Sequence, residues 1–435
     1  MTTQTRDLLG ERPMSRFQIA AIATGVCLNM LDGFDILAMS FAASFVKADF
    51  HLDGTHLGYL FSAGLVGMGL GSLVLGPVAD RRGRRPVVLF SVALAGAGML
   101  GSAATHGFWG MLFTRAATGF GIGGAIACVA VVVAEFSSNR HRSAALAAFS
   151  TGYPVGATVG GLLTKYAIGL YGWQSAFVIG GVMTLLLLPV AWFRLPESID
   201  FLTNRQPADA LARANRLLAA MHLPALTGLD TARADGRQPA FAEVRRILTP
   251  TTGFAWVMFF FTMAAFYFVL SWTPRLLTEA GLSAQQGLTG GVVLNFGGIV
   301  GCGGFALAAA FLAARRLMIG SLLGSIATIA LFGLVLDDLS LALGTAVFLG
   351  TIANAAMSGL YAIGPQLYPA EVRATGMGWA IGMGRLGAIL APMLSGALLD
   401  VGWVPRQLYF LYAGCFAVAL IALLQIRRDA SGAMA

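Results

Sequence analysis

The chain has 435 residues, of which 57% are hydrophobic and only 11% are charged. A soluble protein of this length would carry about a quarter of charged residues, so the composition excludes a soluble globular protein. The net charge of +8 comes from 26 arginines and two lysines. Because most of these lie in short loops between apolar blocks, they do not form the solvated basic face that nucleic-acid binding requires.

Twelve apolar blocks follow one another, each long enough to cross a bilayer as a helix. The first six cover residues 17–45, 57–78, 86–105, 108–134, 143–168 and 173–195. The second six cover residues 253–273, 287–312, 317–336, 341–367, 376–399 and 407–426. We expect an all-α membrane protein with twelve transmembrane helices in two six-helix bundles. Residues 1–195 form the N-terminal bundle with a short tail, 196–252 a linker, and 253–435 the C-terminal bundle with a short tail.

The positive charges predict the orientation. If the N-terminus is cytoplasmic, the tails and even-to-odd loops hold 22 of the 28 lysines and arginines, while the outer loops keep four: Lys47, Lys165, Arg275 and Arg406. Cytoplasmic loops of membrane proteins are enriched in these residues. We therefore expect both termini and the linker in the cytoplasm, and the protein in the inner cell membrane.

The linker, residues 196–252, contains 13 charged residues, with leucine and alanine at helical spacing in 208–221. This pattern predicts one or two surface helices. A solvated tether without chemistry is the simpler interpretation.

An internal echo indicates duplication. Residues 134–142 read AEFSSNRHR and residues 368–376 read YPAEVRATG. Aligning Arg142 with Arg373 brings Gly156 onto Gly387. Two homologous bundles packed around a central site fit this pattern.

Two carboxylates, Asp32 and Asp35, lie inside the first apolar block. A charged side chain at mid-membrane costs about 2.5 to 3.5 kcal/mol on insertion scales, so both should face a cavity or a partner. Spaced i and i+3, they lie on one side of the helix. Burial and mutual repulsion disfavour two simultaneous charges, which predicts a group that takes up a proton outside and releases it inside. The alternative is a structural pair with a buried arginine.

Two arginines also lie inside apolar blocks. Arg115 reaches the depth of the two aspartates, so it is expected to pair with one of them or to contact a bound carboxylate. Arg385 lies near mid-depth, with no evident acidic neighbour in the second-half spans, and is the better candidate to grip an anionic substrate. A contact with carbonyls of another helix is the alternative for Arg385.

Residues 76–85 between the second and third blocks read GPVADRRGRR. This string resembles the signature loop of the major facilitator superfamily. Arg115 with the glycines at 119, 121 and 123 resembles that superfamily's RxxxGxGxG pattern, and Pro196-Glu197-Ser198 resembles its sequence after the sixth span. In that family the loop takes part in switching between outward-open and inward-open states. The resemblance therefore implies a gating role for Gly76, Asp80, Arg81, Gly83 and Arg84.

Asp32-Gly33-Phe34-Asp35 resembles the DGxD string of the aromatic acid:proton symporters within that superfamily. By this resemblance, transport requires Asp32, Asp35, Arg115, Glu135, Arg373 and Arg385. Glu135 and Arg373 lie at the cytoplasmic ends of their spans, and we expect them in ion pairs that hold one conformation.

The family implies import of a benzoate-like or hydroxybenzoate-like anion with protons. We expect a monomer and no cofactor. An aromatic ligand needs apolar walls with a few polar groups. Mid-span candidates for these walls are Phe34, Tyr153, Phe266, Tyr267, Asn295, Asn354, Tyr361 and Trp379.

Import of another organic acid (a muconate, lactone or dicarboxylate) and drug:proton antiport stay open as alternatives. An enzyme or receptor is disfavoured because the five histidines lie in loops without a metal-ligand pattern, no Walker loop occurs, and no large domain is appended.

Overall fold

The computed structural model describes residues 13–229, 249–368 and 372–426, and within these ranges it is all-helical. The N-terminal bundle contains α2 (Arg16–Asp49), α3 (Gly54–Arg82), α4 (Arg84–Ala103), α5 (Phe108–Phe136), α6 (Arg142–Tyr171) and α7 (Gln174–Arg194). Two short helices follow, α8 (Ile199–Arg205) and α9 (Ala210–Ala220). The C-terminal bundle contains α11 (Pro250–Glu279), α12 (Ala284–Ala308), α13 (Ala314–Leu334), α14 (Leu339–Ile363), the 3-10 turn η1 (Gly364–Leu367), α15 (Arg373–Asp400) and α16 (Pro405–Gln425).

Several helices begin a few residues before the apolar block that predicts them, because polar side chains cap their first turns. The hydroxyl of Ser15 accepts a hydrogen bond from the backbone N–H of Gln18, and the side-chain oxygen of Gln18 accepts one from the backbone N–H of Ser15. Asp53 accepts from the backbone of His56 at the start of α3. Such caps satisfy N–H groups that have no partner inside the helix.

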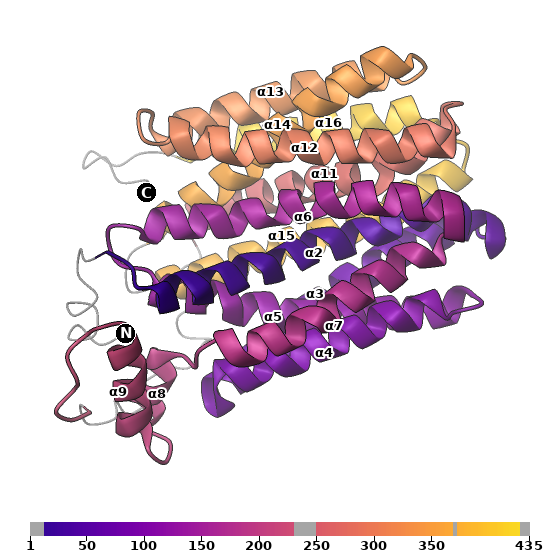
Figure 1. The fold of residues 1–435 in the computed structure, drawn as a ribbon. Coiled ribbons are helices and arrows are strands. Elements are labelled where there is room, and N and C mark those ends of the chain that lie inside the picture. Colours follow the sequence, from indigo (N-terminus) through magenta and orange to yellow (C-terminus); the bar gives the residue numbers. More distant parts are fainter. Residues whose placement is uncertain (1–12, 230–248, 369–371, 427–435) are drawn as a thin grey trace.

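Eleven of the described helices are long and apolar enough to cross a membrane. The helix α6 is 30 residues long but is not among these eleven. It is rich in glycine, serine, threonine and tyrosine, and it lies within the same layer of helices, packed against α2 and α12 (Figure 1). With α6 added to these eleven, the prediction of twelve spans stands as a prediction.

The two bundles repeat the same packing plan. In each, the first helix packs on the fifth (α2 on α6, α11 on α15) and the second on the fourth (α3 on α5, α12 on α14). A Cβ added to Gly156 of α6 would overlap the carbonyl of Met30, and one added to Gly387 of α15 would overlap the carbonyl of Phe260. The two glycines that the sequence alignment brings together therefore occupy equivalent backbone contacts, which we call the glycine seams.

Polar contacts join the bundles at the end far from residues 76–85. The hydroxyl of Ser40 in α2 donates to the carbonyl of Ser271 in α11 at 2.7 Å. The carboxylate of Asp400, at the end of α15, accepts from the backbone N–H groups of Gly54 and Thr55 at 2.7 Å each. Lys47 pairs with Glu279 across the same end at 3.5 Å. These contacts close this end of the interface between the bundles.

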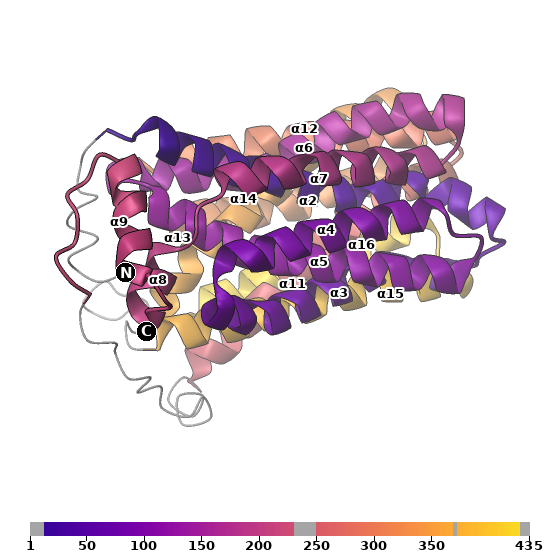
Figure 2. The ribbon, with the colours of Figure 1, turned by 60° about the horizontal axis from the view of Figure 1, so that its bottom comes forward.

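The opposite end carries α8 and α9, together with the start of α2 and residues 76–85 (Figures 1 and 2). Leu218 of α9 and Ile199 of α8 are buried against an apolar cluster that includes Phe136 and Leu195 of the N-terminal bundle. The two short helices are therefore docked on this bundle. We call this the signature-loop end.

Candidate functional site

A buried ion pair lies inside the N-terminal bundle. The guanidinium of Arg115 in α5 contacts the carboxylate of Asp35 in α2 with both prongs, Nη1 to Oδ1 at 2.7 Å and Nη2 to Oδ2 at 3.0 Å. Both residues are 2% exposed. The guanidinium also lies over the ring of Phe177 at 5.6 Å. The predicted pairing of Arg115 with an aspartate is thus present, and Asp35 is the partner.

The space beside this pair is small. A cavity of about 10 Å³ is bordered by Asp35 and Arg115 together with Phe61, Met68 and Ser271. Such a volume holds at most about one water molecule. This cavity therefore has no room for an aromatic acid beside Arg115 in this conformation.

Asp32 behaves differently from Asp35. It is buried, and its Oδ1 has no hydrogen-bond partner among the described residues. It is close enough to Arg385 of α15 to interact with it electrostatically, although no ion pair joins the two side chains. A partnerless carboxylate in a buried place is costly, and a proton would remove its charge.

Three tyrosines complete a polar cluster around Asp32 and Arg385. Both charged groups interact electrostatically with Tyr267 of α11, Tyr153 of α6 and Tyr361 of α14. The hydroxyl of Tyr153 is buried without a partner. The cluster therefore draws side chains from both bundles and offers a cation, a carboxyl group and a free hydroxyl.

Gly33 explains the glycine of the DGxD string. A Cβ at this position would overlap the carbonyl of Tyr153, so glycine lets α6 cross α2 in direct backbone contact. This crossing brings Tyr153 beside Asp32.

Phe34 requires a correction. Its ring is buried and lies against Gly160 and Gly180, between α6 and α7. It fills a packing gap inside one bundle, because glycine at both positions leaves room for a ring. The predicted contact between Phe34 and a substrate does not fit this arrangement.

The remaining wall candidates divide into buried and exposed residues. Phe266 packs edge to face on Tyr267. The buried amides of Asn295 and Asn354 each donate to a carbonyl one turn earlier, and Oδ1 of Asn295 has no partner among the described residues. Tyr361 is 42% exposed despite its place near Arg385. Trp379 is 46% exposed, and its ring stacks on that of Trp256 with the centroids 5.9 Å apart. Along α15, Trp379 precedes Arg385 by about two turns.

A second polar network holds residues 76–85, which we call the signature loop. Gly83 has φ +103°, which favours glycine, and a Cβ there would crowd the carboxylate of Glu197. That carboxylate accepts from the backbone N–H groups of Arg84 at 2.7 Å and Arg85 at 3.2 Å. The guanidinium of Arg84 contacts Glu135 and Ser198 and lies 3.8 Å from Asp80. The loop is thus tied to α5 and to the segment before α8.

The expected ion pair is present at Glu135, whereas Arg373 forms none with the residues that the structure describes. Glu135 pairs with Arg84 inside the N-terminal bundle. Arg373, the first residue of α15, is exposed and forms no ion pair with any residue that the structure describes. Gly76 and Arg81 differ from the rest of the loop, since a Cβ at Gly76 would meet open space and Arg81 is exposed.

Two sets of contacts were not predicted from the sequence. Pro196-Glu197-Ser198 was visible only as a resemblance, without its contacts to Arg84. The capping of α3 by Asp400 could not be predicted from the sequence, because it depends on how the two bundles pack against each other.

Comparisons with known proteins agree with this architecture. The family model described as Major Facilitator Superfamily matches residues 24–360. The chain is 32% identical to a gallate transporter of Pseudomonas putida, covering 96% of this chain and 94% of that one. It is 30% identical to the 4-hydroxybenzoate transporter PcaK of the same species, covering 92% and 90%. The solved xylose transporter XylE from E. coli, in a partially occluded inward open conformation, superposes with a TM-score of 0.77 at 15% identity, covering 97% and 100%.

Proposed function

The chain belongs to the major facilitator superfamily and is related to its aromatic acid transporters, and from this premise we propose that it imports a benzoate-like or hydroxybenzoate-like anion together with protons. It is a multi-pass membrane transporter and not an enzyme. The substrate and the coupling to protons are the proposed part.

One observation carries the proposal: the buried carboxyl group of Asp32, whose Oδ1 has no hydrogen-bond partner among the described residues, interacts electrostatically with Arg385 of the other bundle. An arginine that lacks a paired carboxylate can hold the carboxylate of a substrate. When substrate occupies Arg385, Asp32 loses the nearby positive charge that favours its ionised form, so it takes up a proton. Anion and proton are then bound together, and the pair is released together.

The polar contacts between the bundles support alternating access. Ser40, Asp400 and Lys47 seal the end far from the signature loop. We assign this conformation to the step in which the cluster faces the signature-loop end. Rocking the two bundles would break these contacts and expose the cluster on the other side.

The tyrosine hydroxyls favour a hydroxylated ring. Tyr153 has a buried hydroxyl without a hydrogen-bond partner among the described residues, and Tyr267 is close enough to Arg385 to interact with it electrostatically. A ring hydroxyl on the substrate would satisfy the hydroxyl of Tyr153, whereas unsubstituted benzoate would leave it unpaired. The gallate and 4-hydroxybenzoate named for the relatives fit this expectation.

An uptake panel in proteoliposomes tests the function. Radiolabelled benzoate, 4-hydroxybenzoate, gallate and muconate are offered with an imposed pH gradient, with and without a protonophore. We expect the hydroxybenzoates to accumulate most and the protonophore to abolish accumulation. Accumulation that persists with the protonophore would refute proton coupling, and a preference for muconate would favour the aliphatic-acid alternative.

A further inference from the structure

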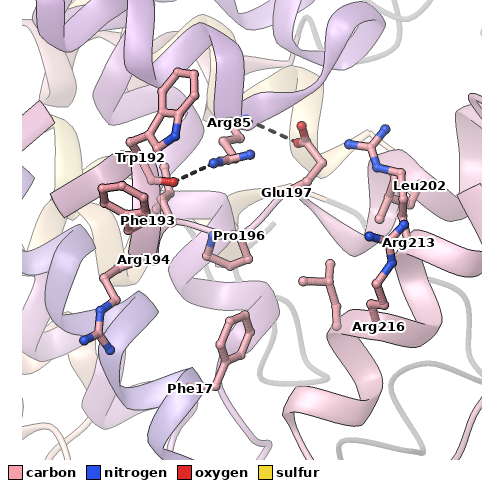
Figure 3. A pocket seen from close by; sticks show the side chains of 12 residues that line it. Phe17, Arg85, Trp192, Phe193, Arg194, Pro196, Glu197, Leu202, Arg213 and Arg216 are labelled. Atoms are coloured by element: carbon pink, nitrogen blue, oxygen red, sulfur yellow. Dashed lines mark hydrogen bonds between the residues drawn. The ribbon is translucent and has the colours of Figure 1, made fainter. Parts of the chain in front are cut away.

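A pocket of about 260 Å³ lies where α7 ends and α9 passes beside it (Figure 3). Arg213 and Arg216 line it on the α9 side, and Arg85 and Trp192 line it on the opposite side. Phe17 of α2 contributes an aromatic ring. None of these residues belongs to the cluster around Asp32 and Arg385, so the pocket is a separate feature of the molecule.

The pocket carries an excess of positive charge. Among the described residues, four arginines line it, Arg194 being the fourth, against a single carboxylate, Glu197. That carboxylate already accepts hydrogen bonds from the backbone of Arg84 and Arg85. Arg213 and Arg216 form no ion pair with any residue in the described part of the chain. Their charges are therefore available to an anion.

Arg85 also has unused hydrogen-bonding capacity. Its Nη2 donates to the carbonyl of Trp192 at 2.5 Å, and its guanidinium lies over the Trp192 ring at 5.5 Å. Its Nε is buried without a hydrogen-bond partner among the described residues. Arg85 is thus held in place by Trp192 while one donor stays unsatisfied.

The rim of the pocket has the character of a membrane interface. Trp192 and Phe193, in the last turn of α7, are 56% and 81% exposed. Exposed aromatic residues at the end of a membrane-spanning helix lie at the level of the lipid headgroups. A ligand here meets arginines on one side and apolar rings on the other, which is the pattern that an anionic lipid fits.

We propose that this pocket binds the phosphate headgroup of an anionic phospholipid from the leaflet beside α8 and α9. Arg213 and Arg216 contact the phosphate, and Trp192 and Phe193 contact the start of the acyl chains. Basic pockets between membrane helices are general sites for such headgroups, and arginine matches the geometry of phosphate. Because Arg213 and Arg216 belong to α9, a bound lipid fixes this helix to the N-terminal bundle beside the signature loop.

Lipid binding to the purified full-length protein tests the proposal. Native mass spectrometry compares retention of phosphatidylglycerol and phosphatidylcholine by the wild type and by the double variant Arg213→Gln/Arg216→Gln. A basic residue near the surface contributes about 1 kcal/mol to the attraction of an anionic lipid, so losing two should weaken phosphatidylglycerol binding by more than about tenfold. Binding of phosphatidylcholine should stay unchanged.

The matched control is Arg140→Gln/Arg316→Gln, which removes two exposed arginines outside the pocket. It should retain phosphatidylglycerol as the wild type does. Equal retention by the pocket variant and the wild type would overturn the proposal, and so would an equal loss in the control. Glycerol phosphate is added as a soluble competitor, and its full displacement of the lipid at millimolar concentration would show that the pocket selects a free phosphate.

Discussion

The two aspartates of α2 are three residues apart, yet they have opposite surroundings. Asp35 is locked inside the N-terminal bundle by both prongs of Arg115. Asp32 borders a small cavity among α2, α4, α5 and α7, interacts electrostatically with Arg385 of the other bundle without forming an ion pair, and keeps Oδ1 without a hydrogen-bond partner among the described residues. The difference teaches that a charge satisfied within one bundle serves the architecture, whereas a charge left open between bundles is available for a ligand or a proton.

Removing Asp35 should have the largest effect on stability. The substitution Asp35→Ala leaves the buried guanidinium of Arg115 without its partner, which costs about 3–5 kcal/mol. We expect a large drop in the yield of folded protein and in the thermal unfolding midpoint in detergent. The double variant Asp35→Ala/Arg115→Leu removes both charges and should recover most of the loss. If Asp35→Ala were as stable as the wild type, the structural role assigned to Asp35 in contrast to Asp32 would be wrong.

Asp32→Asn should keep the fold and lose coupling. Asparagine has nearly the same shape but cannot exchange a proton, so accumulation driven by a pH gradient should stop while exchange of substrate across the membrane continues. Proteoliposome uptake and counterflow measure the two activities separately, with Asp53→Asn as a control at an exposed aspartate. If Asp32→Asn accumulated substrate normally, a residue other than Asp32 would have to carry the coupled proton.

Arg385→Lys should weaken substrate binding more than it slows transport. Lysine keeps the charge but loses the two-pronged grip, and hydrogen bonds to charged groups are worth about 1.5–3 kcal/mol. We expect the half-saturation concentration for uptake to rise by about tenfold or more. Arg406→Lys, at the start of α16, is the control and should leave it unchanged.

Gly83→Ala should destabilise the signature loop moderately. With φ +103° and ψ 151°, this residue occupies a region that essentially only glycine tolerates, at a cost of about 1–3 kcal/mol for other residues. The added methyl would also crowd Glu197. Gly76→Ala is the matched control, because a Cβ there meets open space. Equal unfolding midpoints for the two variants would contradict the role assigned to Gly83.

The smallest effect concerns Asp53. The backbone N–H of His56 donates to it and holds the pKa of this carboxyl below its ordinary value of 3.8. A lowered pKa in the folded state means that the stabilisation is complete above that ordinary value and is lost as the pH falls below it. The difference in unfolding midpoint between the wild type and Asp53→Asn should therefore be small at pH 7 and vanish toward pH 3. A difference in unfolding midpoint that grows as the pH falls would mean that folding raises the pKa of Asp53, which contradicts this prediction.

Much of the fold was predictable because apolar length and caps are local properties. The depth of Arg115 along α5 likewise predicted an aspartate partner. The sequence could not decide between Asp32 and Asp35, since both lie on one side of α2 and the choice depends on how α5 and α15 approach it. Phe34 was misassigned for the same reason, because its packing against Gly160 and Gly180 requires the positions of α6 and α7. The pairing of Glu135 with Arg84 depends on the path of a loop.

The glycine seams have a mechanical consequence. At Gly156 and Gly387 the backbone of one helix rests directly on a carbonyl of another, so sliding would force a side chain or a peptide group into occupied space. These contacts favour each half of the molecule moving as a rigid unit. In the proposed alternating access, the deformable parts would then be the long side chains where the halves meet, and small shifts there would decide which side of the membrane the site faces.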